Sequence, residues 1–346
     1  MAVYRSKLAV YAVILESTFG GGGVFTDADV IEATADTSMK PEVDSIERKG
    51  VCFSFVPKQK LAGKQHGSGT FGVELIPAVD GKGVSGGKIL RVALGVEEAP
   101  GDGTGAFIGY SDAGATPAFE IYEAKPGETG TAYLYKLNEP CADQESLALK
   151  QIYGCDTTDS QSLTFTGVIP NNVKLDFPVA DICTLTFDIG AANFITASGE
   201  DVLTSQCASQ IPYVGRNAKF TVDDVTYEAK DVSITVENTV SDRDGITTAG
   251  IVDKVITQKV IKGSFKVTFR NWDELDRLKN NYQGKLYLEL ASDGNKFAVF
   301  MPAVNWTSVG VEDDDGVLVN SIEFEATVPN GDAYEGAPIL IAHENA

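Results

Sequence analysis

Two histidines are the residues of this sequence best suited to act as a general base. A serine or cysteine nucleophile needs such a base within hydrogen-bond reach. His66 lies in the glycine-rich stretch 63–69, and His343 lies three residues before the last residue. No H-E-x-x-H pattern for a zinc hydrolase is present either. We therefore predict that the chain is not an enzyme and has no catalytic residues.

Acidic and glycine-rich clusters are the next candidates, for metal or phosphate binding. Residues 242–245 and 312–316 resemble fragments of calcium loops, but no glutamate follows at the spacing that closes an EF-hand loop. The four glycines at 20–23 lack the lysine and hydroxyl residue of a P-loop. The five cysteines include no C-x-x-C pair, which indicates free thiols. The sequence predicts no metal site and no cofactor.

The charge of the chain restricts its partners. The formal net charge is −21 at pH 7, and a surface of this sign repels both DNA phosphates and anionic lipids. No stretch approaches the roughly 20 apolar residues of a membrane helix. The apolar run at 11–15 is too short for a signal peptide. We expect a soluble, cytosolically made protein that neither reads DNA sequence nor enters a membrane.

The elements that would position any site are mainly strands. Apolar and polar residues alternate with period two in both halves, as in strands with one buried face. Asp-Gly pairs and residues 170–172 predict turns between these runs. Short helices are expected at 88–95 and 271–282, with Trp272 and Trp306 in the core. The alternating runs lie at 51–55, 71–75, 163–165, 173–177, 185–189, 232–236, 265–269, 286–290 and 322–326.

An internal repeat predicts two domains of one kind. Gly69-Thr-Phe-Gly-Val-Glu-Leu75 and Gly263-Ser-Phe-Lys-Val-Thr-Phe269 each follow an expected strand, at 51–55 and 232–236, and each precedes an expected helix. We therefore divide the chain into two β domains, residues 1–207 and residues 208–346. Each is predicted to be a β-sandwich or half-barrel with one flanking short helix.

One predicted loop is unusually long. Residues 237–254 exceed the length of an ordinary hairpin turn and mix apolar with polar residues. A loop of this kind is either mobile or ordered against a partner. The residues expected to contact that partner are Asn238, Val240, Ile246, Ile251 and Val252.

The order of these segments resembles that of the larger tail tube proteins of long-tailed bacteriophages. The first half resembles them through Val51-Cys-Phe-Ser-Phe55, the 69–75 segment and the helix that follows. The second half is similar to the domain that forms the wall of the conduit, through Ala218-Lys-Phe-Thr-Val222, the long loop, the 263–269 segment and the second helix. The resemblance covers nearly the whole chain and depends on element order, because this family has no catalytic motif.

The resemblance implies a structural virion protein. Six tube domains would close into a β-barrel ring around a DNA-sized channel, and rings would stack through the 237–254 loop into the tail tube that delivers the genome. Two tube domains per chain imply homotrimeric, pseudo-hexameric rings, and one implies a homohexamer. Further implied partners are the tail terminator, tape-measure and baseplate proteins. The tube would assemble in the host cytoplasm, and DNA would pass through it without sequence-specific binding.

A carbohydrate-binding or adhesive β-sandwich module is the alternative interpretation. It would explain the strand content and the acidity, but it would not require the repeat. Such modules usually present aromatic residues on an exposed face, whereas Trp272 and Trp306 are expected in the core.

Overall fold

The computed structural model describes residues 9–47, 60–77, 84–98, 106–110, 119–123, 131–137, 144–154, 160–199, 203, 211–216, 218–245, 251–328 and 337–345. The predicted strand at 51–55 lies outside these ranges. The same is true of the Asp-Gly pairs that begin at Asp80 and Asp102 and of four of the five cysteines. Cys183 is described and buried, and burial raises the pKa of its thiol to about 12.

The described elements of the first half are twelve strands, one α-helix and a short 3-10 helix at Asp27–Asp29. The strands are β1 (Ala9–Leu15), β2 (Val30–Ile31), β3 (Ser38–Ile46), β4 (Leu61–Glu74), β5 (Gly95–Glu98), β6 (Ala106–Tyr110), β7 (Phe119–Glu123), β8 (Thr131–Leu137), β9 (Leu147–Tyr153), β10 (Gln161–Phe177), β11 (Thr184–Ala191) and β12 (Asn193–Ser198). The helix is α1 (Gly87–Leu94).

The second half contributes eight described strands and one α-helix. The strands are β13 (Lys219–Val222), β14 (Val225–Thr226), β15 (Ala229–Asp244), β16 (Ile251–Thr268), β17 (Gln283–Ser292), β18 (Asn295–Asp314), β19 (Val317–Ala326) and β20 (Leu340–Asn345). The helix is α2 (Asp273–Lys279). Both helices lie where the sequence predicts them: α1 has the expected length but begins one residue earlier, and α2 is shorter than the predicted 271–282 segment.

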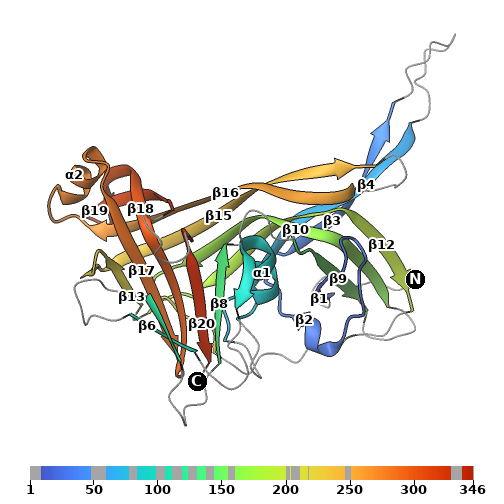
Figure 1. Cartoon of the computed structure of the whole chain (residues 1–346), viewed down its shortest axis with the longest axis horizontal. Coiled ribbons are helices and arrows are strands. Elements are labelled where there is room, and N and C mark those ends of the chain that lie inside the picture. The colour runs from blue at the N-terminus through green and yellow to red at the C-terminus, as the bar shows by residue number, and fades with distance from the viewer. Residues whose placement is uncertain are drawn as a thin grey trace.

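A long antiparallel layer runs through both halves. Its strand order is β3–β4–β11–β10–β15–β16–β19–β18. The N-terminal part of β10 belongs instead to a second layer, β2–β1–β9–β10–β12. The C-terminal part of β10 pairs with β15, and β20 pairs with β8, so hydrogen-bonded ladders join the two halves. Figure 1 shows β15 and β16 extending from the end that carries α2 toward β3 and β4.

The core lies on one face of the long layer. Alternate residues of the inner strands, such as β11, β15 and β19, are buried there, so the period-two pattern of the sequence corresponds to the pleat. Both helices cover this face: α1 packs against β10, and α2 packs against β18. α1 ends at Gly95, whose φ of 115° is in the left-handed region that glycine adopts without strain. Fully buried members of this core are Phe71, Phe187, Leu175, Ile234, Ile322 and Phe324.

Two turn or loop predictions are wrong. Residues 170–172 form no turn, because β10 passes through them with a bulge between Pro170 and Asn172. Residues 237–254 are mostly strand, because β15 continues to Asp244 and β16 begins at Ile251. Polar residues in these segments resemble loop signals, but a strand of an antiparallel sheet with one solvent-exposed face also carries polar residues.

The predicted mainly β fold with two short helices is confirmed. The turns at Asp293-Gly294 and Asp315-Gly316 connect β17 to β18 and β18 to β19 as expected, with positive φ at all four residues. The division into domains at residues 207 and 208 stays a prediction.

Candidate functional site

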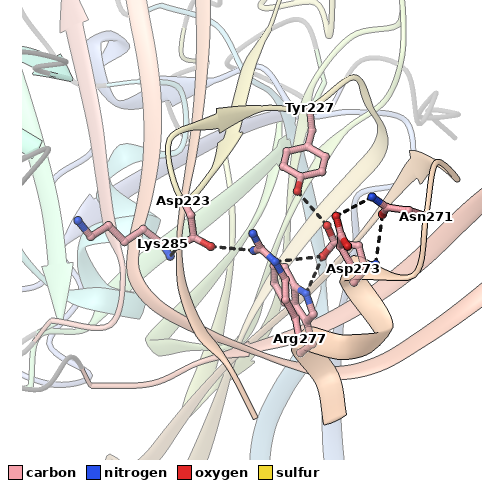
Figure 2. Close-up of polar contacts among 8 residues, drawn as sticks. Asp223, Tyr227, Asn271, Asp273, Arg277 and Lys285 are labelled. Carbon is pink, nitrogen blue, oxygen red and sulfur yellow. Dashed lines mark hydrogen bonds and ion pairs between the residues drawn. The ribbon is translucent and has the colours of Figure 1, made fainter. Parts of the chain in front are cut away.

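The most connected polar cluster lies under α2. Glu274 is buried on the inner side of this helix, and its two oxygens accept hydrogen bonds from Tyr227 Oη and Trp306 Nε1, both at 2.9 Å. Arg277 lies 3.9 Å from the same carboxylate and 2.7 Å from Asp223. Figure 2 shows the side chains of Tyr227, Asp223 and Arg277 beside α2. Burial, together with the charge of Glu274, raises the pKa of Tyr227 to about 12.

This cluster is a structural brace. Its charged atoms are paired with one another, and Asp223 also accepts from the backbone amide of Lys285 at 2.9 Å. Asn271 and Asp273 close the helix N-terminus through a hydrogen bond between their side chains at 2.6 Å (Figure 2). The cluster therefore fixes α2 on the sheet and leaves no group free to act on a substrate.

Neither histidine belongs to the polar cluster under α2. His66 Nε2 lies 3.0 Å from a carboxylate oxygen of Glu42 between two strands. His343 is fully buried on β20, and its ring meets that of Tyr213 edge to face at 6.2 Å. Burial lowers the pKa of His343 to about 4. Within the described part of the chain, no group of three His, Cys, Asp or Glu side chains is arranged to hold a metal ion.

The face of the long layer opposite the core is polar and acidic. Serine, threonine and charged side chains alternate there with the buried residues. Several charges pair across strands, such as Lys262 with Glu237 and Lys266 with Glu312, at 2.8 and 3.4 Å. Acidic residues outnumber basic ones on this face; they are Glu42, Asp176, Asp188, Glu237, Glu312, Asp314, Glu323 and Glu325, against Lys40, Lys174, Lys230, Lys262 and Lys266.

Both ends of the long layer are open edges. Among the described strands, β3 pairs only with β4, and all of its residues except Met39 are exposed. β18 pairs with β17 only as far as Asn305, so no described strand covers its outer edge beyond that residue. Apolar side chains remain exposed near both edges, as Val43 is on β3 and Val311 is on β18. Open edges of this kind are templates for pairing with another chain.

The predicted contact residues of the 237–254 segment differ in how far they are buried. Asn238 is buried and donates to the backbone oxygens of Ala93 and Pro170 at 3.2 and 3.0 Å. Ile251 is also buried in the single chain. Val240 is half-buried and Val252 is exposed. Ile246 lies outside the described residues.

The end of the β15–β16 hairpin lies on first-half strands. The Ile251 amide donates to the Ala192 oxygen at 3.3 Å. The carboxylate of Asp242 lies 3.2 Å from Nζ of Lys64 on β4 and 3.0 Å from Nζ of buried Lys254. Partial burial of Asp242 acts against its charge, but the two lysines lower the pKa of its carboxyl overall. The predicted loop is therefore ordered against its own chain over the described residues.

Comparison of the chain with models of protein families shows the family to which it belongs. The model of the phage tail tube protein family matches residues 6–328. The chain belongs to the phage tail tube protein family. It is therefore a structural component of the phage tail and not an enzyme. No curated protein matches the chain, and among the described residues no helix is long and apolar enough to cross a membrane.

The edges of this tail tube protein are the feature that sequence patterns missed. The exposed strand β3 has weak alternation and contains Pro41, so it does not resemble a sheet strand in sequence. The signal available in the sequence was the presence of Met39, Val43 and Ile46 among polar residues. Trp272 was also misplaced: it is 58% exposed, and only Trp306 is in the core.

Proposed function

We propose that the chain polymerises into stacked rings that form the tail tube and serve as the conduit for the genome. The single observation that carries this proposal is the long layer with an open edge at each end. Copies joined head to tail through two different edges form a closed ring if the rotation between them closes. A closed barrel then leaves no exposed edge.

Three copies per ring fit the layer best. Each half of the chain contributes four consecutive strands, β3–β4–β11–β10 and β15–β16–β19–β18. Each half thus fills one of the six tube-domain positions that the family resemblance implies. A homohexameric ring would instead require one such unit per chain.

The acidic polar face is the proposed lining of the channel. The core face is covered by the helices and other strands, which leaves the polar face for the inside of a barrel. Negative charge there repels the phosphate backbone, so DNA moves through without being held. Assembly would occur in the host cytoplasm, with the tail terminator, tape-measure and baseplate proteins as further partners.

Negative-stain electron microscopy of the purified protein at rising concentration tests the proposal. Hollow stacked tubes with threefold or pseudo-sixfold end views are expected. A protein that stays monomeric at every concentration would count against ring assembly. A carbohydrate-binding module would present an exposed aromatic residue, and Trp272 is exposed. Family membership nevertheless favours the tube.

A further inference from the structure

The two halves of the long layer repeat one strand order and one irregularity. In each half the fourth strand pairs with the third, and that ladder contains a bulge. The bulge lies between Pro170 and Asn172 in β10, and between Trp306 and Ser308 in β18. A bulge is a specific feature of register, so its recurrence shows which residues of the two halves correspond.

The ladders extend this correspondence across all four strands. In the first half Val173 lies opposite Phe187, which lies opposite Phe71. In the second half Val309 lies opposite Ile322, which lies opposite Phe265. Two residues before each phenylalanine is a glycine, whose partner is Met39 in β3 and Ile234 in β15. Met39 therefore corresponds to Ile234, and Val309 corresponds to Val173.

Within the chain, the halves are joined by β10 and β15. These strands are antiparallel, with residues 172–177 opposite residues 237–232. The pairs Val173–Val236 and Leu175–Ile234 are completely buried at this junction. The junction is thus a complete example of how the last strand of one four-strand unit pairs with the first strand of the next.

We propose that β18 of one copy pairs with β3 of the next copy in the same register. Residues 308–313 then lie antiparallel to residues 42–37, with Gly310 opposite Lys40 and Val311 opposite Met39. The partner is a second copy of this chain. This inference rests on the proposed ring assembly and specifies its interface.

Side-chain chemistry at the two open edges agrees with this register. It places Val309 opposite Pro41 and Val311 opposite Met39, so apolar residues meet on the core side, as they do at the junction. Val311 is 42% exposed in the single chain, whereas the corresponding Leu175 is fully buried. Pro41 lacks an N–H, which removes at most one hydrogen bond from the ladders of β3.

Charges and the projecting hairpin give further support. The register puts Lys40 diagonally across from Glu312 and places no like charges directly opposite each other. Val43 is 47% exposed in the single chain. The corresponding residue of the second half, Asn238, is buried, because the β15–β16 hairpin lies against the first half. The β3–β4 hairpin projects beyond the rest of the molecule (Figure 1), as expected of a segment that lies on a neighbouring copy.

Disulfide trapping in assembled tubes tests the register. Lys40→Cys and Gly310→Cys are introduced into separate chains, which are then mixed, assembled and oxidised. Both positions are on the polar side, and a Cβ at Gly310 would meet its nearest atom, the Ser321 oxygen, at 4.0 Å. The matched controls pair Gly310→Cys with Ser38→Cys or with Glu42→Cys, each shifted by two residues, where Cβ atoms are too far apart for a disulfide.

We expect cross-linked dimers from the Lys40→Cys mixture and a fall to the single-cysteine background in both controls. Normal tubes that cross-link only in a control, or in none of the mixtures, would overturn the register and leave ring assembly intact. If the parent chain forms no tubes, ring assembly itself is wrong, and the register is rejected with it.

Discussion

At the residue scale, the buried carboxylate of Glu274 shows how a site-like cluster can be purely structural. Its partners come from three segments of the chain: Tyr227 lies between β14 and β15, Arg277 is on α2 and Trp306 is on β18. A buried charge is tolerated only when its hydrogen-bonding capacity is met. The cluster therefore stabilises the position of α2.

Glu274→Ala should lower the free energy of unfolding by about 3 kcal/mol, because it leaves Tyr227 Oη and Trp306 Nε1 without their acceptor and removes one of the two carboxylates beside Arg277. Urea denaturation of the variant measures this change. Asp276→Ala, on the exposed side of the same helix, is the matched control and should change stability by less than about 0.5 kcal/mol. Equal effects of the two substitutions would refute the assigned role.

His343 should make the fold sensitive to acid. Its pKa falls from 6.5 in a solvated state to about 4 in the folded chain because of burial. The unfolded state therefore binds the proton first as the pH drops, and stability is lost between about pH 6.5 and pH 4, by up to about 3 kcal/mol.

Urea unfolding at neutral and mildly acidic pH measures that loss. His343→Leu should reduce the difference between the two conditions, whereas His66→Gln, which alters the only other histidine, should retain it. The same pH dependence in His343→Leu as in the parent would exclude His343 as its source.

At the element scale, α1 belongs to the first half but is capped by the second. Lys259 on β16 donates to the Leu94 oxygen at 2.5 Å, and Asn238 on β15 donates to the Ala93 oxygen at 3.2 Å. The last carbonyls of a helix have no partner within the helix, so these side chains complete it. Burial lowers the pKa of Lys259 to about 8.

Asn238→Ala should destabilise the chain by about 2 kcal/mol, because the Ala93 and Pro170 oxygens lose a buried donor. Thermal or urea unfolding measures the change, with exposed Thr239→Ala as the control on the same strand. A variant that folds as stably as the parent but forms no tubes would instead favour the intersubunit role predicted for Asn238.

At the scale of the whole molecule, the long layer runs from β3 to β18, and no described strand pairs with the outer edge of β3 or with the outer edge of β18 beyond Asn305. The two edges of this layer differ, so the edge of one copy can pair with the other edge of a neighbouring copy in a head-to-tail arrangement.

Val311→Glu should leave the single chain folded, because the side chain is exposed. It should prevent tube formation by placing a charge among the apolar side chains that meet at the proposed interface. Size-exclusion chromatography and microscopy measure both outcomes.

Val225→Glu is the control for that substitution, since Val225 is also exposed but belongs to the small β13–β14 hairpin. It should assemble as the parent does. Tubes formed by Val311→Glu would show that this edge is not part of the interface.

Assembly should also hide the polar face. A cysteine introduced at Glu323 should react with a polyethylene-glycol maleimide in the monomer and be protected in tubes, because the reagent is excluded from the channel. A cysteine at Asp276, on the exposed side of α2, should react in both states. Labelling above that of the parent chain is measured by gel shift, and continued labelling at position 323 in tubes would place this face outside the channel.

The sequence by itself determined the strands with one buried face, the two helices and the absence of a catalytic pattern. Alternation at 232–236 or 322–326 follows from one buried face, and this local signal needs no knowledge of the partner strand. The Gly-x-Phe segments at 69–75 and 263–269 likewise mark equivalent strands in the two halves. Element order supported the correct family for the same reason.

Only the tertiary structure decided which residues face a partner. Asn238 and Val252 occupy similar sequence surroundings, yet one caps a helix of the other half and the other is exposed. Polar strand residues resemble loop residues until their ladder is known, because burial depends on contacts between segments far apart in the chain. The open edges at β3 and β18 are visible only once all eight strands of the layer are in order.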